Sequence, residues 1–476
     1  MKSLGRQIGW LTIGQSAIRG AQIVAFLSLI RLIDSDEWNS LALAFSVYFV
    51  GVTIGSLNLE HSVLAFLPRI ELHHYRTFLI QTRRVLLVAA AITVSIVLLA
   101  QFTLRFMDGT WQTVLLSAAI LLEIPAVIGG PVFIARGLHQ AAGIWDLASA
   151  LSFLLCLFVP AITFGSATSI LVGLFVYSVV RSIGFAIVLH RIEGEQLEMP
   201  IGDLARKQLL FCAPLGISLA LGTLTRTVDK WLVAWQLPHS IGAYTIAAQE
   251  IPLLAVLPYA GGAAVSTYLV HHLTNNNRVA AHTAWRQQAE MLCFPVVTLS
   301  VAIALLSPEL LSVLLPHAPA GTAMSFAVFS LIGIHRVTEY GVVLRAANQN
   351  RKIVESAAIV LIGCVIFGFV GVNFAGLVGV SLGTSIAFAF GWIAILRQIS
   401  FIFGLTIREV FPWITWLRAL NSSVGALVGA ILVSHFFESN VTRAVVKLIT
   451  FVAIVQIVRW AGGDHKVVAL TQGRSG

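Results

Sequence analysis

Long apolar runs follow one another along almost the whole chain, and short polar segments separate them. The stretches at residues 85–100 and 148–163 are typical, because neither is confined to one amphipathic stripe. A helix needs about 20 apolar residues to cross a hydrocarbon core about 30 Å thick. In lipid only helices and closed barrels satisfy their backbone hydrogen bonds, and the alternation expected of a barrel strand is absent from this sequence. The pattern therefore predicts an all-α polytopic membrane protein.

We expect about fourteen transmembrane helices from the length of these runs. The two spans that meet at residues 371–376 are separated by almost no loop. The predicted spans are roughly residues 8–32, 39–67, 85–106, 113–136, 145–165, 168–190, 209–236, 241–270, 290–315, 320–344, 353–373, 376–398, 412–436 and 442–461.

Lys and Arg gather in every second loop, after the even-numbered spans. The intervening loops, such as residues 34–37 and 237–240, are short and poor in both. Basic residues mark cytoplasmic loops, so the alternation predicts a multi-pass membrane protein with both termini in the cytoplasm. The basic residues are Arg69, Arg76, Arg83, Arg84, Arg136, Arg191, Arg206, Lys207, Arg278, Arg286, Arg345, Arg351, Lys352, Arg397 and Arg408.

The composition supports this interpretation. Only 11% of residues are charged and 58% are hydrophobic, whereas a soluble domain carries about 25% charged residues. The net charge of +9 does not indicate nucleic-acid binding, because the basic residues form no continuous patch. The four cysteines all lie in apolar segments without metal-ligand spacing. We therefore expect no metal, no cofactor and no nucleic-acid partner.

A repeat with a spacing of roughly 200 residues connects the two halves of the chain. Two segments share Arg, Gln, Ile and an acidic residue at offsets 0, 4, 8 and 10, namely Arg136, Gln140, Ile144, Asp146 and Arg345, Gln349, Ile353, Glu355. Six helices per repeat predict two parallel lobes about a pseudo-twofold axis along the membrane normal. We assign residues 1–200 and 201–405 to the lobes, and 406–476 to two additional helices and a cytoplasmic tail.

Several ionisable residues fall inside the predicted spans, where each costs at least about 2.5–3.5 kcal/mol to insert. The candidate substrate-binding residues are Arg19, Arg226, Lys230 and Arg336, and the candidate coupling or cavity acids are Asp229, Glu250 and Glu123. Basic side chains suit a phosphate group, since an Arg fork can bond two phosphate oxygens. The alternative is that these charges pair with one another and only hold the lobes together. Arg226 and Glu250 lie at equal sequence distance from Pro238, which predicts an ion pair between them.

The chain resembles the polysaccharide flippases, the O-antigen and exopolysaccharide transporters of the MATE-like MOP superfamily. The resemblance lies in Ile30-Arg-Leu-Ile-Asp-Ser-Asp-Glu-Trp-Asn-Ser-Leu-Ala-Leu-Ala44, in Thr227-Val-Asp-Lys-Trp-Leu-Val-Ala and in Ile241-Gly-Ala-Tyr-Thr-Ile-Ala247. Asp34 and Asn39 stand where glycines are usual, and Lys230 replaces the more usual Arg.

The resemblance implies transport of an undecaprenyl-pyrophosphate-linked oligosaccharide across the cytoplasmic membrane by alternating access. It also implies proton or sodium coupling, and a polysaccharide polymerase and a chain-length regulator as partners. A multidrug or cation antiporter and a lipid II flippase of the same superfamily remain alternatives. A membrane-embedded glycan polymerase or ligase is disfavoured by the short outward loops, and the sequence has no P-loop. We therefore expect a transporter and not an enzyme.

Overall fold

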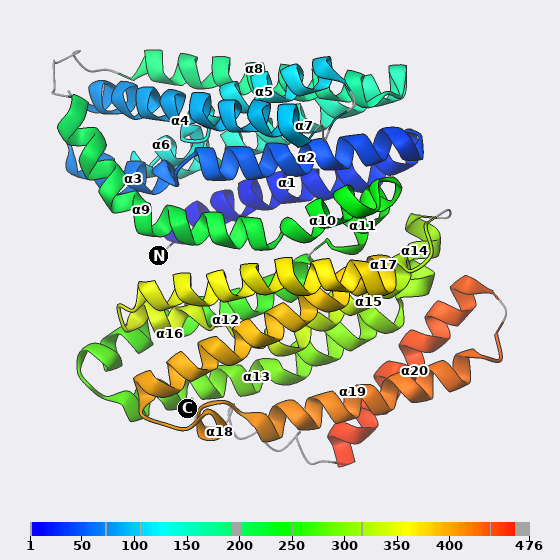
Figure 1. Cartoon of the computed structure of the whole chain (residues 1–476). Helices are drawn as coiled ribbons and strands as arrows, with labels where there is room; N and C mark the ends of the chain where they lie inside the picture. Colours follow the sequence, from blue (N-terminus) through cyan, green and yellow to red (C-terminus); the bar gives the residue numbers. More distant parts are fainter. Residues whose placement is uncertain are drawn as a thin grey trace. The chain divides into compact units, whose positions relative to one another are not determined.

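The computed structural model describes residues 2–71, 74–104, 107, 109–192, 201–249, 251–315, 318–437 and 439–461. Within these ranges the chain is helical and contains no strand (Figure 1). The chain packs as two compact units, residues 1–242 and 243–476. Eleven of the described helices are long and apolar enough to cross a membrane. The predicted all-α membrane fold is thus confirmed, while the number of fourteen spans stays a prediction.

The first unit is a bundle of long helices that run side by side (Figure 1). Its principal packed pairs are α1 with α7, α5 with α8, α7 with α8 and α4 with α5. The helices are α1 (Lys2–Leu32), α2 (Ser35–Gly55), α3 (Leu59–Phe66), η1 (Leu67–Arg69), α4 (Tyr75–Leu104), α5 (Thr110–Ala126), α6 (Gly129–Ala135), α7 (His139–Phe164), α8 (Ala167–Arg191), α9 (Ile201–Thr225), α10 (Val228–Gln236) and η3 (Pro238–Ser240).

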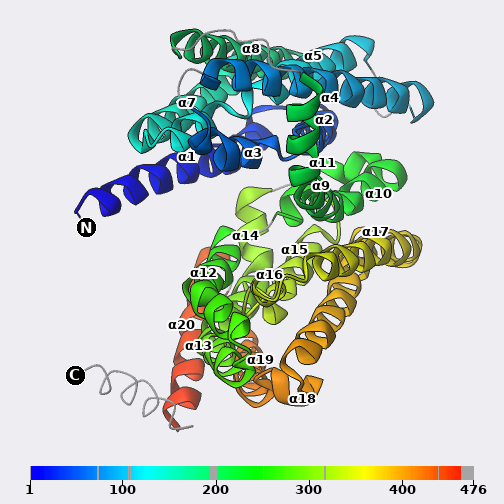
Figure 2. The ribbon, with the colours of Figure 1, turned by 90° about the vertical axis from the view of Figure 1, so that its left-hand side faces the viewer.

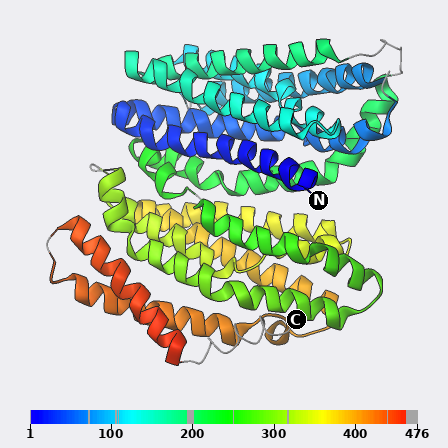
Figure 3. The ribbon, with the colours of Figure 1, turned by 180° about the vertical axis from the view of Figure 1, so that it is seen from behind.

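In the second unit α13 packs against α12, α15 and α19. The hairpin of α19 and α20 is shown in orange and red in Figure 3. The helices are α11 (Ile241–Ala247, which begins at the unit boundary), α12 (Pro252–Thr274), α13 (Arg278–Leu305), α14 (Ser307–Leu314), α15 (Thr322–Leu331), η4 (Ile332–His335), α16 (Gly341–Ala346), α17 (Asn350–Phe403), α18 (Ile407–Val410), α19 (Trp413–Ser434) and α20 (Asn440–Ala461).

Helix α9 packs within the first unit, although the sequence repeat assigns its residues to the second lobe. Gln208 on α9 donates hydrogen bonds to Thr82 on α4 and to Ser62 on α3, at 2.8 Å and 3.3 Å. Packing and internal repetition are different criteria for dividing a chain. The lobes at residues 1–200 and 201–405 therefore stay a prediction beside the observed units.

Helix α6 in the first half of the chain and helix α16 in the second half end in the same way. After α6, Gly137 has a left-handed φ of 73°, and the N–H of Leu138 donates to the carbonyl of Phe133 at 2.8 Å. After α16, Asn348 has a φ of 57°, and the N–H of Gln349 donates to Leu344 at 2.8 Å. Both are the left-handed helix ending that glycine and asparagine favour. This ending aligns Gly137 with Asn348, two positions beyond the alignment that the sequence match predicts.

Helix α17 contains the tight reversal expected near residues 371–376. Ala375 and Gly376 leave the helical region, and Gly376 has a φ of 53°. The two arms diverge from this point in Figure 2. Beside it the backbones touch, because a Cβ on Gly379 would lie 1.8 Å from the carbonyl oxygen of Gly371. Glycines of this kind let membrane helices approach closely.

We expect Gly379→Ala to destabilise the protein. The added methyl group meets backbone that cannot rotate away, and overpacking of this kind costs about 1–3 kcal/mol or more. Gly425→Ala in α19 is the matched control, because its Cβ would meet nothing within 4 Å, and alanine favours a helix by about 1 kcal/mol over glycine. In thermal unfolding of the detergent-solubilised protein, Gly379→Ala should melt below the wild type and Gly425→Ala should not. Equal melting temperatures would contradict the close contact.

Candidate functional site

A largely buried ion pair connects α5 and α8 in the first unit. Glu123 on α5 accepts a hydrogen bond from the guanidinium of Arg181 on α8. The exposed fraction of the side chain is 4% for Glu123 and 15% for Arg181. Glu123 lies just before Pro125 and the break at residues 127–128 that separates α5 from α6. A break of this kind in a transporter helix often marks the substrate or ion site.

Aromatic side chains surround the guanidinium of Arg181. Its Cζ lies 5.9 Å from the ring centre of Trp145 and 5.8 Å from that of Tyr177. A nitrogen of Arg181 also donates to the hydroxyl of Tyr177 at 3.4 Å. Tyr48 on α2 forms a hydrogen bond with Ser178 at 3.4 Å, one residue beyond Tyr177. Cation–π contacts strengthen when desolvated, so these rings hold Arg181 in place.

A cavity of about 190 Å³ adjoins this pair. Oε2 of Glu123 and Nε of Arg181 are buried and have no hydrogen-bond partner among the described residues. Unmade bonds of charged groups are costly, and the cavity has room for several waters at about 30 Å³ each. The polar lining comprises Gln22, Tyr48, Glu123, Ser149, Tyr177 and Arg181.

Arg19 on α1 is not among the residues that line this cavity. Its neighbours Ile18 and Gln22 contribute to the lining, whereas Arg19 itself is exposed. It has no ion-pair partner within the part of the chain that the structure describes. Arg19 is thus available to a ligand outside the cavity.

Three further candidates of the first unit gather where α9 gives way to α10. Arg226 is exposed at the break, Asp229 is buried, and Lys230 is half-buried. The ammonium of Lys230 donates to the backbone carbonyl of Arg226 at 2.9 Å. The backbone N–H of Lys230 donates to the carboxylate of Asp229 at 2.8 Å. Lys230 therefore satisfies a carbonyl left open by the helix break.

The second unit contains the remaining described candidate. Arg336 lies in the interruption between η4 and α16, and its Cζ is 5.1 Å from the ring centre of Phe388. The nearby Glu339 accepts a hydrogen bond from Arg345. Glu250 lies outside the described residues, so its predicted ion pair with Arg226 stays a prediction.

Two of the three sequence segments that carry the family resemblance, those beginning at Ile30 and at Ile241, contact each other at Asn39. Its side-chain oxygen accepts from the N–H of Gly242 at 2.8 Å, and its side-chain nitrogen donates to the carbonyl of His239 at 3.0 Å. A Cβ on Gly242 would lie 2.2 Å from the ring of Trp38. Asn39, which replaces the usual glycine, therefore connects the start of α2 to the segment at His239 and Gly242 through two hydrogen bonds.

Sequence reasoning missed Arg181. A usable signal exists, because Arg181 is the only Lys, Arg, Asp or Glu in the predicted span 168–190. An arginine inside the membrane needs a partner for its charge, and Glu123 is the only acid of the predicted span 113–136, two spans earlier in the chain. The structure brings these two together, while the sequence alone did not pair them.

Comparison with known proteins places the chain in a family. The sequence profile described as polysaccharide biosynthesis protein matches residues 4–265, more than half of the chain. The chain belongs to this family. A search of curated protein sequences found no match.

Solved structures show the same fold. A structure titled lipid II flippase MurJ, in an inward closed conformation, aligns with a TM-score of 0.67 at 15% identity, covering 93% of this chain and 99% of that one. An inward-facing multidrug resistance MATE transporter aligns with a TM-score of 0.59 at 12% identity, covering 79% and 95%. A MOP superfamily transporter from Pyrococcus furiosus aligns with a TM-score of 0.58 at 13% identity, covering 83% and 95%.

These findings confirm the predicted resemblance. The chain has the fold of MOP superfamily transporters and belongs to a polysaccharide biosynthesis family. The proteins it resembles in fold are titled as transporters and a flippase. Together with the eleven candidate spans of the described residues, these findings make the chain a multi-pass membrane protein.

Proposed function

We propose that this protein translocates an undecaprenyl-pyrophosphate-linked oligosaccharide across the bacterial cytoplasmic membrane for synthesis of O-antigen, capsule or exopolysaccharide. The match to the polysaccharide biosynthesis family over residues 4–265 carries the proposal. The fold shared with a structure titled lipid II flippase supports it. Both termini are cytoplasmic in this proposal, and a polysaccharide polymerase and a chain-length regulator act on the product at the outer face.

Arginines bind the pyrophosphate in this mechanism. Arg19 and Arg226 are exposed on the first unit, and Arg336 lies beside a helix interruption of the second. A guanidinium donates two parallel hydrogen bonds to phosphate oxygens and keeps its charge at every physiological pH. Lys230 contributes positive charge beside Arg226. The sugars stay hydrated while the charged group is carried between the leaflets.

Glu123 is the coupling acid in this proposal. One of its oxygens is bonded to Arg181, and the other is buried without a hydrogen-bond partner among the described side chains. Glu123 also lines the cavity of about 190 Å³. Protonation or a sodium ion at the second oxygen weakens the attraction to Arg181 and changes the packing of α5 against α8. Alternating access needs such a two-state element. Asp229 is less suited, because a backbone N–H already occupies one of its oxygens.

Transport by reconstituted vesicles tests the role of Arg19. The substrate is a fluorescent undecaprenyl-pyrophosphate oligosaccharide, and its arrival in the opposite leaflet is measured by accessibility to a membrane-impermeant quencher. We expect Arg19→Gln to lower the initial rate about tenfold or more, because a hydrogen bond to a charged group is worth about 1.5–3 kcal/mol. Arg19→Lys should retain an intermediate rate.

Arg84→Gln is the matched control, since Arg84 is an exposed arginine near the predicted cytoplasmic end of α4. Undiminished flux in Arg19→Gln would remove Arg19 from the mechanism. Parallel vesicles containing lipid II or a lipophilic cation distinguish the related functions. Faster transport of lipid II than of the oligosaccharide would favour a lipid II flippase, and transport of the cation alone would favour an exporter.

A further inference from the structure

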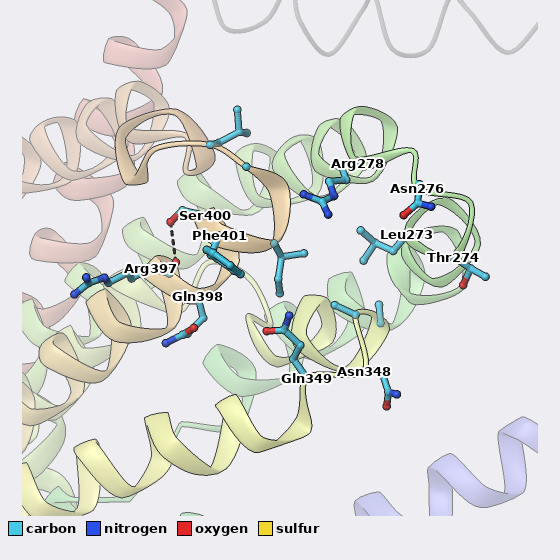
Figure 4. A pocket seen from close by; sticks show the side chains of 15 residues that line it. Leu273, Thr274, Asn276, Arg278, Asn348, Gln349, Arg397, Gln398, Ser400 and Phe401 are labelled. Atoms are coloured by element: carbon cyan, nitrogen blue, oxygen red, sulfur yellow. Dashed lines mark hydrogen bonds between the residues drawn. The ribbon is translucent and has the colours of Figure 1, made fainter.

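The second unit holds a cavity of about 930 Å³ at one end of its helices. Three segments form the walls: the turn from α12 to α13 at residues 273–278, the turn from α16 to α17 at residues 346–349, and the end of α17 at residues 397–405. Figure 4 shows Arg278 and Gln349 extending from separate walls toward the space between them, whereas the side chain of Arg397 points away from that space. Ligand sites typically measure about 300–1,000 Å³.

The lining is cationic and rich in amides. It contains two arginines, four amide side chains and two hydroxyl side chains, and no carboxylate lines it; these polar residues are Arg278, Arg397, Asn276, Asn348, Gln349, Gln398, Thr274 and Ser400. Amides donate hydrogen bonds without adding negative charge. A lining of this composition favours an anion that accepts several hydrogen bonds at once.

Other basic side chains on the same helices are neutralised, which sets the two cavity arginines apart. On α13 Arg286 pairs with Glu290 at 3.1 Å. On α17 Arg351 and Lys352 pair with Glu355 at 3.1 Å and 2.8 Å. Arg278 and Arg397 have no carboxylate partner anywhere in the described ranges. The cavity therefore retains its positive charge.

Helix starts and helix ends both meet at this cavity, and the ends of α12, α16 and α17 bring partial negative charge to it. Helix α13 begins at Arg278 and helix α17 begins at Asn350, next to Gln349 of the lining. Helix N-termini carry partial positive charge and unpaired N–H groups. The left-handed residues Asn276 and Asn348, with φ values of 55° and 57°, turn the chain into these two starts. Because helix starts and helix ends both contribute, the net positive charge of the cavity comes from its two arginines.

One wall is apolar. Phe401 is 78% exposed, and Leu273, Ile402 and Leu405 also line the cavity. The basic loops place this end of the helices at the cytoplasmic membrane surface. An exposed aromatic ring at that level suits a molecule that joins a charged head to an apolar chain. Basic pockets between helices at this surface are a known type of anionic-lipid site.

We propose that this cavity binds a phosphate ester, with Arg278 and the Gln349 amide on the phosphoryl oxygens and Phe401 beside the apolar portion. The phosphate belongs either to the head group of an anionic membrane lipid or to a soluble phosphate ester of the cytoplasm. The site is separate from the candidate residues of the transport mechanism. It does not depend on which substrate the protein moves.

Binding to the purified full-length chain tests this proposal. Native mass spectrometry counts retained molecules of phosphatidylglycerol, with phosphatidylcholine as the neutral comparison, and inorganic pyrophosphate is titrated separately as the soluble probe. We expect Arg278→Gln to weaken binding about tenfold, because a charge-assisted bond is lost. Arg397→Gln should weaken it less, and the double variant the most. Arg136→Gln is the control, an exposed arginine at the corresponding helix ending of the first unit.

The two probes identify the source of the phosphate. Weaker retention of phosphatidylglycerol alone supports a lipid head-group site, and weaker binding of pyrophosphate alone supports a soluble ester. If the variant binds both phosphatidylglycerol and pyrophosphate more weakly, and pyrophosphate displaces the lipid from the wild type, the site recognises the phosphoryl group itself. If Arg278→Gln and Arg136→Gln bind both probes as the wild type does, the proposal is overturned. It is likewise overturned if phosphatidylcholine is retained as well as phosphatidylglycerol.

Discussion

Replacing Arg181 by alanine should destabilise the first unit by about 3–5 kcal/mol, the cost of leaving one member of a buried ion pair uncompensated. The carboxylate of Glu123 is 4% exposed and would have no cation beside it in the variant. The rings of Trp145 and Tyr177 would also lose their contact with the guanidinium. A large drop in the apparent melting temperature of the solubilised protein is the expected measurement.

The double variant Arg181→Met with Glu123→Leu separates stability from function. Replacing both members of a buried pair by apolar side chains of similar size is often neutral or stabilising, so this variant should fold. If the pair serves only packing, the double variant transports at the wild-type rate. If Glu123 couples transport to an ion, the double variant is folded but its flux no longer responds to an imposed proton or sodium gradient.

Glu355→Gln is the matched control, because it removes a carboxylate that pairs with Arg351 and Lys352 on α17. That carboxylate is 40% exposed, and exposed ion pairs contribute at most about 1 kcal/mol. It should therefore leave both melting and gradient response near the wild type. A gradient response that persists in the Arg181→Met, Glu123→Leu variant would remove Glu123 from the coupling mechanism.

The fold was largely predictable because lipid imposes strict rules on a sequence. The span expected at residues 145–165 is helix α7, His139–Phe164, and that at 168–190 is α8, Ala167–Arg191. Any apolar run of this length must be a helix if no water can satisfy its backbone. The reversal in α17 was predictable as well, since Gly376 supplies the left-handed conformation that the turn requires.

The helix interruptions were not predictable from apolar runs. Leu57 and Asn58 adopt left-handed φ values of 51° and 57° within the predicted span 39–67, and leucine has no preference for that conformation. The break between α9 and α10 follows Arg226 without any glycine or proline at residues 223–237. Tertiary packing must hold these breaks open. Hydropathy therefore predicts where the spans lie but does not predict where a helix breaks within a span.

The candidate site also has a part that the sequence predicts and a part that only the packing of helices decides. A charge inside a predicted span is visible in the sequence, and Glu123 was selected on that basis. Its partner could not be derived, because 58 positions separate Glu123 from Arg181 and only the packing of α5 on α8 joins them. Likewise, the sequence gives no means of deciding that Gln22 lines the cavity while Arg19 does not. That choice depends on how α1 is rotated against its neighbours.

A second buried pair, between Glu309 on α14 and Lys447 on α20, connects the last helix to the rest of the second unit. Its nitrogen and oxygen are 2.6 Å apart, and the side chains of Lys447 and Glu309 are 10% and 7% exposed. Beside it α20 packs Phe451 and Val455 against Val301 and other apolar residues. The sequence repeat leaves α19 and α20 outside both lobes, so their attachment depends on contacts of this kind.

We expect Lys447→Ala to cost about 3–5 kcal/mol, because Glu309 would remain buried without a cation. Lys447→Met with Glu309→Leu should restore the melting temperature, and Arg418→Gln, an exposed position on α19, should not change it. Limited proteolysis should cut the connection between α19 and α20 faster in Lys447→Ala alone. If that variant melts and resists protease as the wild type does, apolar packing by itself holds the last helix. If Lys447→Ala transports more slowly but the double variant transports at the wild-type rate, α20 stabilises the second unit without taking part in transport.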